Sequence, residues 1–130
     1  MSLTAPAAAQ EQAVRGEVPA EEFVVIVRDS LPYAYGLIAG LVAELRASER
    51  EFADNLVAPP DEQARGQLLR ALASDSIRGA LEGHFGVRLA FQNCHRVVAF
   101  RAGAEDGAAY LEFTSVRAQL LNQRPELVNC

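Results

Sequence analysis

Cys94 and His95 are the two neighbouring residues with the clearest chemical potential in this sequence. A cysteine nucleophile needs a base within hydrogen-bonding reach, and histidine often supplies it. Adjacent side chains of a strand point to opposite faces, so His95 can serve Cys94 only if the chain turns or bulges there. His84 could approach Cys94 through the fold. Cysteine is also among the most buried residue types, and a core thiol is therefore the simpler interpretation.

The residues around Cys94 resemble a known active-site motif. Asn93 to Val98, with the sequence NCHRVV, is similar to the Pro-Cys-His-Arg-Val motif of the O6-alkylguanine-DNA alkyltransferases, and Tyr35 to Ala39 is similar to their Tyr-Gly-x-Ile-Ala segment. The resemblance implies that Cys94 accepts an alkyl group. We do not adopt it, because asparagine replaces the proline before the cysteine and because, by subtraction, 59 residues separate Tyr35 from Cys94.

A ligand-binding centre is a second hypothesis for this region. Cys94 is its candidate catalytic thiol, and His84, His95, Arg96 and Tyr35 are its candidate ligand-binding residues. A reactive thiolate needs a lowered pKa and partial exposure. No metal site is predicted, because the histidines and cysteines lack the closely spaced pairs that zinc sites show. We expect no cofactor.

Gly36, Gly40, Ala43 and Ala47 form a stripe of small residues at helical spacing. Glycine inside a helix costs about 1 kcal/mol relative to alanine. Two glycines four residues apart therefore indicate that another helix approaches closely. That helix belongs either to the same chain or to a second copy, and in the second case the stripe is an interface.

The composition describes an acidic chain of one-domain size. The 130 residues are half hydrophobic and carry a net charge of −5. Every basic residue is arginine and alanine is abundant, which suggests a GC-rich bacterial genome. The arginines form no basic patch, so nucleic acid is not an expected partner. The longest apolar stretch, Leu31 to Ala43, is shorter than the roughly 20 residues that a bilayer requires. The N-terminus lacks a signal-peptide pattern, so we expect a cytoplasmic protein.

Helical periodicity dominates the first two thirds of the chain. Residues 1–18 have no apolar period, so we expect a flexible tail before a single domain over 19–130. Apolar spacing and capping residues indicate where the helices lie. They are predicted over 32–47, 60–73, 75–85 and 115–121.

The sequence does not decide the secondary structure of two short segments. Residues 20–28 fit a helix, because Pro19 and two glutamates suit a first helical turn. The β-branched run from Val24 to Val27 fits a strand equally well. Residues 48–51 either extend the preceding helix or begin a short one, and Pro59 ends it.

Alternating apolar residues predict strands in the last third of the chain. Residues 87–92 and 96–100 have this pattern, and AAYLEFT at 108–114 is expected to add a further strand. The predicted fold is therefore a helix-rich α+β domain. It has about four to five helices and a small two- to three-stranded antiparallel sheet in the C-terminal third.

Two hypotheses of function follow, from different classes. The first is a small cytoplasmic bacterial accessory domain, not an enzyme, that associates with itself or binds a partner protein. The small-residue stripe and the high apolar fraction favour it. The alternative is a thiol-dependent or small-ligand-binding protein centred on Cys94. We expect a homo-oligomer or a protein partner, and neither a membrane nor nucleic acid.

Overall fold

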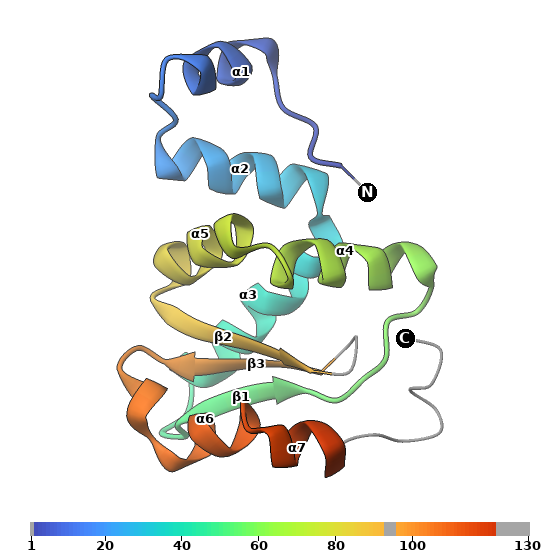
Figure 1. Ribbon diagram of the computed structural model, residues 1–130, viewed down its shortest axis with the longest axis vertical. Coiled ribbons are helices and arrows are strands. Elements are labelled where there is room, and N and C mark those ends of the chain that lie inside the picture. The colour runs from blue at the N-terminus through green and yellow to red at the C-terminus, as the bar shows by residue number, and fades with distance from the viewer. Residues whose placement is uncertain (1, 93–95, 122–130) are drawn as a thin grey trace.

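A three-stranded sheet with helices on both faces forms the centre of the molecule (Figure 1). The computed structural model describes residues 2–92 and 96–121. The helices are α1 (Ala7–Val14), α2 (Ala20–Ser30), α3 (Pro32–Arg46), α4 (Glu62–Leu72), α5 (Asp75–Phe85), α6 (Ala108–Phe113) and α7 (Val116–Leu121), with a short 3-10 helix at Ala104–Asp106. The strands are β1 (Phe52–Asn55), β2 (Val87–Gln92) and β3 (Arg96–Arg101).

The strand order is β1-β3-β2, and both pairings are antiparallel. Phe100 lies opposite Phe52 of β1 and Arg88 of β2, which fixes the register of all three strands. β3 is therefore the central strand, and β1 and β2 are the two edges.

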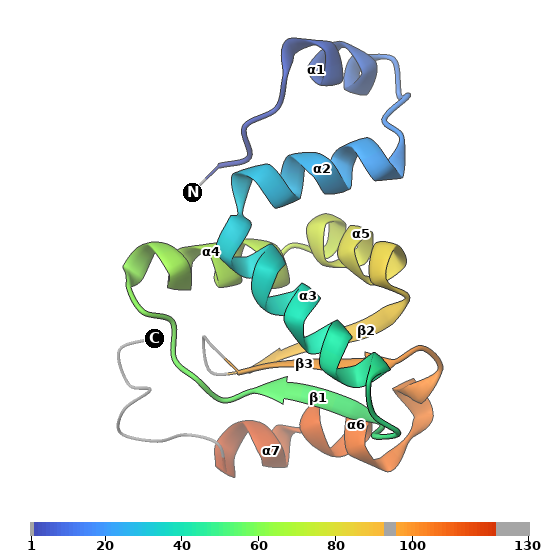
Figure 2. The same cartoon turned by 180° about the vertical axis from the view of Figure 1, so that it is seen from behind.

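The larger helical layer consists of α3, α4 and α5 (Figure 2). α3 crosses behind the sheet and contacts both β1 and β3, while α4 and α5 contact β2. α2 lies outside this layer and contacts α3 and α5, and α1 is farthest from the sheet. The layer buries one large hydrophobic cluster, whose fully buried members include Val27, Leu31, Ala34, Ile38, Leu68, Leu81, Val97 and Ala99.

The smaller layer consists of α6 and α7, on the opposite face of the sheet. Tyr110 and Phe113 of α6 pack against Phe100, with ring centroids 5.2 and 6.1 Å from its centroid. The buried cluster beneath this layer consists of Ala90, Val98, Phe100 and Phe113.

Side-chain caps fix the ends of the helices that flank β2. Asp61 accepts a hydrogen bond from the Ala64 N–H at 2.8 Å and so begins α4. Ser74 caps α5 in the same way, through the Ile77 N–H at 3.4 Å. Gly86 ends α5 with φ +68°, a left-handed conformation that glycine adopts without strain. The chain can therefore turn from α5 directly into β2.

The predicted count of four to five helices is wrong, because the described residues contain seven α-helices. α1 forms in the alanine-rich N-terminal segment, where helix propensity is high, although it buries none of its residues. The strand predicted over 108–114 is also wrong, since Ala108–Phe113 is helix α6. Its alanine, leucine and glutamate favour a helix, and only helical spacing brings Tyr110 and Phe113 onto the same ring of Phe100.

The third strand comes from the middle of the chain. β2 and β3 lie in the predicted C-terminal third, but β1 occupies 52–55, directly after the segment where a helix was expected. Arg101 explains the turn, because its guanidinium donates to the carbonyls of Leu45 and Arg50, at 2.7 and 2.8 Å. These bonds hold the end of α3 against β3 and direct the chain back along the sheet.

The open question about residues 20–28 is decided in favour of helix α2. α2 buries Val24, Ile26 and Val27 on one face, which a helix achieves despite the β-branched run. In the described part of the chain, no single helix has both the length and the apolar character needed to cross a membrane. α2 and α3 meet these criteria only when they are taken together, and the angle between them is 113°.

Candidate functional site

Cys94 and His95 lie outside the described residues. The hypotheses of a reactive thiol and of a Cys94-centred ligand site therefore stay predictions. The neighbouring candidates His84, Tyr35 and Arg96 are described, and their positions can be compared with one another.

His84 and Tyr35 meet on the surface, where three helices come together. The Tyr35 hydroxyl lies 3.3 Å from His84 Nε2, and Nδ1 of the same ring lies 3.4 Å from a carboxylate oxygen of Glu21. The ring also packs edge-on against Phe85, with a centroid distance of 4.7 Å. Because Glu21, Tyr35 and His84 come from α2, α3 and α5, this chain of polar contacts links the three helices.

Arg96 lies apart from that pair, on the face of the sheet that α6 and α7 cover. Its guanidinium is 3.3 Å from a carboxylate oxygen of Asp54 and stacks over the ring of Phe113, 5.2 Å from the centroid. The structure therefore brings together two of the predicted ligand-binding residues, Tyr35 and His84, and places Arg96 on the other side of the sheet.

The stripe of small residues faces solvent. Gly36, Gly40, Ala43 and Ala47 are all exposed, and no atom lies within 4 Å of a Cβ built at either glycine. The face of α3 that packs inside the chain carries larger residues, such as Ile38 and Leu41. Packing within the same chain is therefore not the reason for the small residues, and an interface with a second copy stays a prediction.

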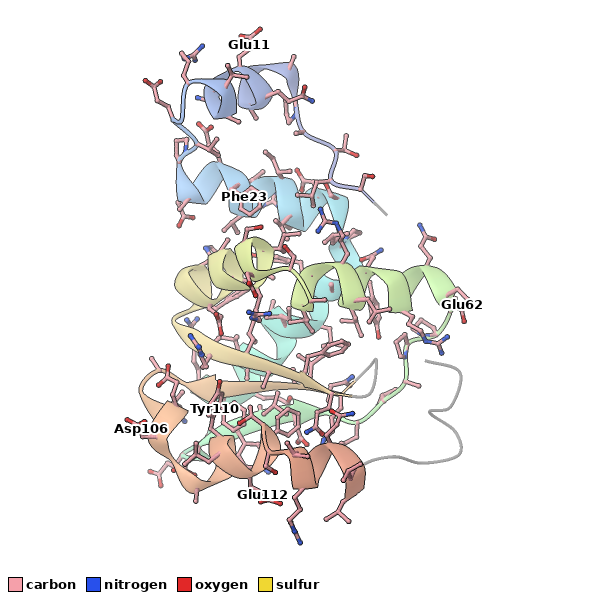
Figure 3. The ribbon with its side chains drawn as sticks, viewed as in Figure 1. Glu11, Phe23, Glu62, Asp106, Tyr110 and Glu112 are labelled. Carbon is pink, nitrogen blue, oxygen red and sulfur yellow. The ribbon has the colours of Figure 1, made fainter. Side chains whose placement is uncertain are left out.

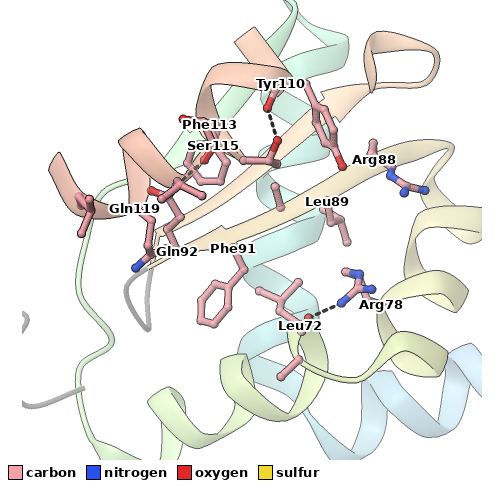
Figure 4. Close-up of a pocket in the computed structure, with 15 residues that line it drawn as sticks. Leu72, Arg78, Arg88, Leu89, Phe91, Gln92, Tyr110, Phe113, Ser115 and Gln119 are labelled. Atoms are coloured by element: carbon pink, nitrogen blue, oxygen red, sulfur yellow. Dashed lines mark hydrogen bonds between the residues drawn. The ribbon is translucent and has the colours of Figure 1, made fainter. Parts of the chain in front are cut away.

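A trough with a volume of about 640 Å³ lies beside β2 (Figure 4). One wall comes from α4 and α5, with Leu72, Ala73 and Arg78. The other wall comes from α6, α7 and their connection. That wall consists of Tyr110, Phe113, Thr114, Ser115, Val116, Gln119 and Leu120. Residues 88–92 of β2 form the floor, and β3 contributes nothing to the lining. The trough therefore runs along the outer edge of β2.

Hydrogen bonds hold both walls in place. Arg78 donates to the carbonyl of Leu72 at 2.7 Å and to Asp75 at 2.6 Å, which fixes the short connection between α4 and α5. On the opposite wall, the side-chain amide of the buried Gln92 donates to the Phe113 carbonyl. The trough is thus a feature of packed elements rather than of a single loop.

The charge of the trough differs from that of the whole chain. Its formally charged lining residues are Arg78 and Arg88, whereas the chain carries a net charge of −5. A hydrogen bond with Tyr110 and, next, the charge of Glu82 raise the pKa of Arg88 above its usual value. Figure 3 shows Tyr110 on α6, beside the sheet. The trough therefore combines apolar walls with two arginines, and each arginine has a carboxylate partner, Asp75 for Arg78 and Glu82 for Arg88.

Sequence reasoning missed this trough. The alternating pattern of 87–92 correctly indicates a strand, but it cannot show that the strand is an edge. The walls come from segments on either side of β2, and one of them, 108–113, was expected to be a strand. Exposed Val116 and Leu120 in the last helix were a signal, because large apolar residues at the surface often line binding sites.

Together, these elements form a small α+β domain with a trough along one sheet edge. The model of the family described as "NucS shadow ORF" matches residues 1–130, and the chain belongs to this family. The short name of the family also contains the letters KH. Neither the curated proteins nor the solved structures contain a match to the chain. Taken literally, the description denotes a reading frame that overlaps a gene for NucS, and it names no activity.

Proposed function

We propose that the folded chain is a partner-binding accessory domain without catalytic activity of its own, and that the trough beside β2 is its binding surface. The observation that carries the proposal is the trough itself. Its volume of about 640 Å³ lies within the range of ligand sites, and packed helices on both sides of β2 shape it. The cytoplasmic location predicted from the sequence remains part of this proposal.

The chemistry of the lining favours binding over catalysis. The described lining offers hydroxyl, amide and guanidinium groups beside apolar side chains, with no carboxylate, histidine or thiol that could act as a general base or nucleophile. Polar groups at fixed positions between apolar walls are typical of recognition sites. Val116 and Leu120 are 79% and 69% exposed, so a partner that covers them gains apolar burial.

Single-stranded nucleic acid is the second candidate ligand, because the family's short name contains the letters KH. KH domains clamp the nucleic-acid backbone with a Gly-x-x-Gly loop. In this chain the Gly-x-x-Gly sequence is Gly83 to Gly86, at the C-terminal end of α5. Backbone carbonyls are exposed at that end of a helix, and they repel phosphate. We therefore rank this ligand second, in spite of the two arginines in the trough.

A pair of matched variants tests the proposal. Leu120→Glu places a charge on the trough wall, whereas Leu111→Glu places the same charge on α6 at an exposed position outside the trough. Tagged wild-type and variant chains are compared as baits in the cells that carry the gene. We expect Leu120→Glu to lose partners that wild type and Leu111→Glu retain. Equal recovery by all three baits would contradict the trough as the binding surface.

Nuclease treatment of the same samples separates the two candidate ligands. Partners held through the trough by protein contacts remain after digestion of RNA and DNA. Loss of all partners on digestion would instead support the nucleic-acid candidate.

The family description makes translation of the reading frame a second, separate test. The chain has no lysine, so trypsin cleaves it after arginine alone and releases Gly79 to Arg88 as one peptide. We expect targeted mass spectrometry to detect this peptide in cells. It should disappear when a stop codon is placed in this frame by a change that is silent in the overlapping gene. Absence of the peptide from wild-type cells would leave the fold without a cellular role.

A further inference from the structure

The outer edge of β2 presents unpaired backbone groups to the trough. In an antiparallel pair, every second residue points its N–H and C=O toward the neighbouring strand, and the residues between point away. The Arg101 N–H donates to Glu51 at 3.1 Å, so residues 97, 99 and 101 of β3 face β1. Residues 96, 98 and 100 face β2 and bond to 88, 90 and 92. Val87, Leu89 and Phe91 therefore point their backbone groups outward.

One hydrogen bond confirms this direction independently. The Leu89 N–H donates to the Glu82 carboxylate at 2.8 Å, on the side away from β3. Glu82 comes from α5, its side chain is 14% exposed, and it lies 3.6 Å from the Arg88 guanidinium. A charged side chain at this place prevents indiscriminate pairing of an exposed edge. The carbonyl of Leu89 and both backbone groups of Phe91 remain directed into the trough.

We propose that the trough binds an extended, acidic peptide segment of a partner protein, which adds to the sheet as a fourth strand beside β2. This inference rests on the proposed function and names the ligand of the same site. The guest backbone bonds to Leu89 and Phe91, its apolar side chains contact the wall at Leu72, and the carboxylates on its other face lie near Arg88, beside Tyr110 of α6.

The open strand edge favours a peptide over nucleic acid, and Arg88 favours an acidic peptide. An open strand edge matches the regular N–H and C=O spacing of another peptide backbone, which a nucleic acid lacks. The Arg88 side chain is 47% exposed, and its guanidinium complements an acidic side chain on the same face of the guest strand.

A designed peptide tests the proposal directly. The probe is an acetylated and amidated eight-residue peptide of alternating valine and glutamate, and its control is the same peptide methylated at every backbone nitrogen. We expect the unmethylated peptide alone to slow hydrogen exchange of the Phe91 amide by about tenfold at saturation. The Asp54 amide, which points outward from the other edge, serves as an internal control because the peptide should leave its exchange unchanged.

Variants of Glu82 sharpen the test. Glu82→Ala frees the Leu89 N–H, so we expect the peptide to bind about twofold to tenfold more tightly. Glu82→Gln keeps a neutral acceptor on α5 and should give a smaller increase in peptide affinity. This variant replaces Glu82→Ala in the test if the alanine variant fails to fold. An unchanged or weakened affinity in the folded variants would overturn pairing at this edge.

The remaining outcomes separate this inference from the proposed function. Equal binding of both peptides in the trough would overturn strand addition and leave the trough as a binding surface. A twelve-nucleotide poly-U probe that protects Phe91 where the peptide does not would overturn the peptide ligand. If neither probe changes the exchange of Phe91, strand addition is overturned, and the Leu120→Glu comparison then decides the proposed function.

Discussion

The two helical layers of this domain cover the sheet very differently. The layer of α3, α4 and α5 shares a large, fully buried cluster with the sheet, whereas the cluster under α6 and α7 has four buried members. α6 and α7 are six residues each, and Val116, Leu120 and Leu121 of α7 remain largely exposed. The first layer therefore supplies most of the stability. The second is a thin cover whose main structural consequence is one wall of the trough.

This difference suggests that one layer stabilises the fold and the other forms a wall of the trough. A wall that buries little apolar surface opens at a lower free-energy cost than the core does, and ligand sites are commonly built from such segments. The arrangement also allows the trough to widen for a guest strand without disturbing α4 or α5. Four predictions test the comparison, in order of decreasing effect.

Leu68→Ala should cause the largest loss. Leu68 is fully buried in α4, and a leucine-to-alanine change in a core costs about 2–5 kcal/mol. Its neighbour Leu69 is 39% exposed, so Leu69→Ala is the matched control with a much smaller expected cost. Urea unfolding followed by circular dichroism measures both. Similar losses for the two variants would contradict the assignment of the main core to this layer.

Gln67→Met should cost less, through a polar contact inside the same layer. The Gln67 side-chain oxygen accepts hydrogen bonds from the Tyr33 and Ala34 N–H groups, at 2.7 and 3.2 Å, and so caps α3 from α4. Methionine fills the space but leaves both buried donors unpaired, at a cost of about 1–3 kcal/mol. Gln67→Glu, which keeps an acceptor, should retain more of the stability in the same unfolding assay. An unperturbed methionine variant would show that α3 does not depend on this cap.

Two helix caps, one in each layer, allow the layers to be compared. Asp61 caps α4 through Ala64, and Ser115 caps α7 through the Ala118 N–H at 3.0 Å. Each change to alanine removes about 1 kcal/mol of capping. We expect Asp61→Ala to lower the global unfolding free energy by this amount. Ser115→Ala should mainly accelerate amide exchange within α7, by about fivefold, with little global effect. A full global loss from Ser115→Ala would show that the thin layer unfolds together with the core.

Gly40→Ala should have the smallest effect, and with the opposite sign. The new methyl group meets no atom within 4 Å, and alanine favours a helix interior by up to about 1 kcal/mol. We expect a small gain in unfolding free energy. Sedimentation of wild type and of a bulkier Gly40→Leu variant then tests the predicted interface. Loss of an oligomer in the leucine variant alone would support self-association through the stripe, and identical sedimentation would contradict it.

Sequence reasoning succeeded where local physics decides the outcome. Apolar spacing and capping residues placed α3, α4 and α5, and in the structure Asp61, Ser74 and Gly86 lie at the ends of α4 and α5. Alternation placed β2 and β3. These features depend on a residue and its near neighbours in sequence, so one sequence contains most of the information needed.

The missed helix α1 is a local feature that buries none of its residues, whereas the other failures involve partners that are distant in sequence. Residues 52–55 form β1 because β3 lies beside them and Arg101 holds the preceding turn. Residues 108–113 form a helix because this conformation allows both Tyr110 and Phe113 to pack against Phe100. Tyr35 and His84 were named as candidates from the sequence, but their contact depends on how α3 and α5 pack.

The sequence by itself therefore determined an acidic, helix-rich α+β chain, its main helix boundaries and its two C-terminal strands. The tertiary structure decided which strand is an edge, which face of α3 is buried, and that a trough with apolar walls lies beside β2. The physical reason is that helix caps and hydrophobic periods act over a few residues. A trough, by contrast, is the space left between elements, and its position depends on how all of them pack together.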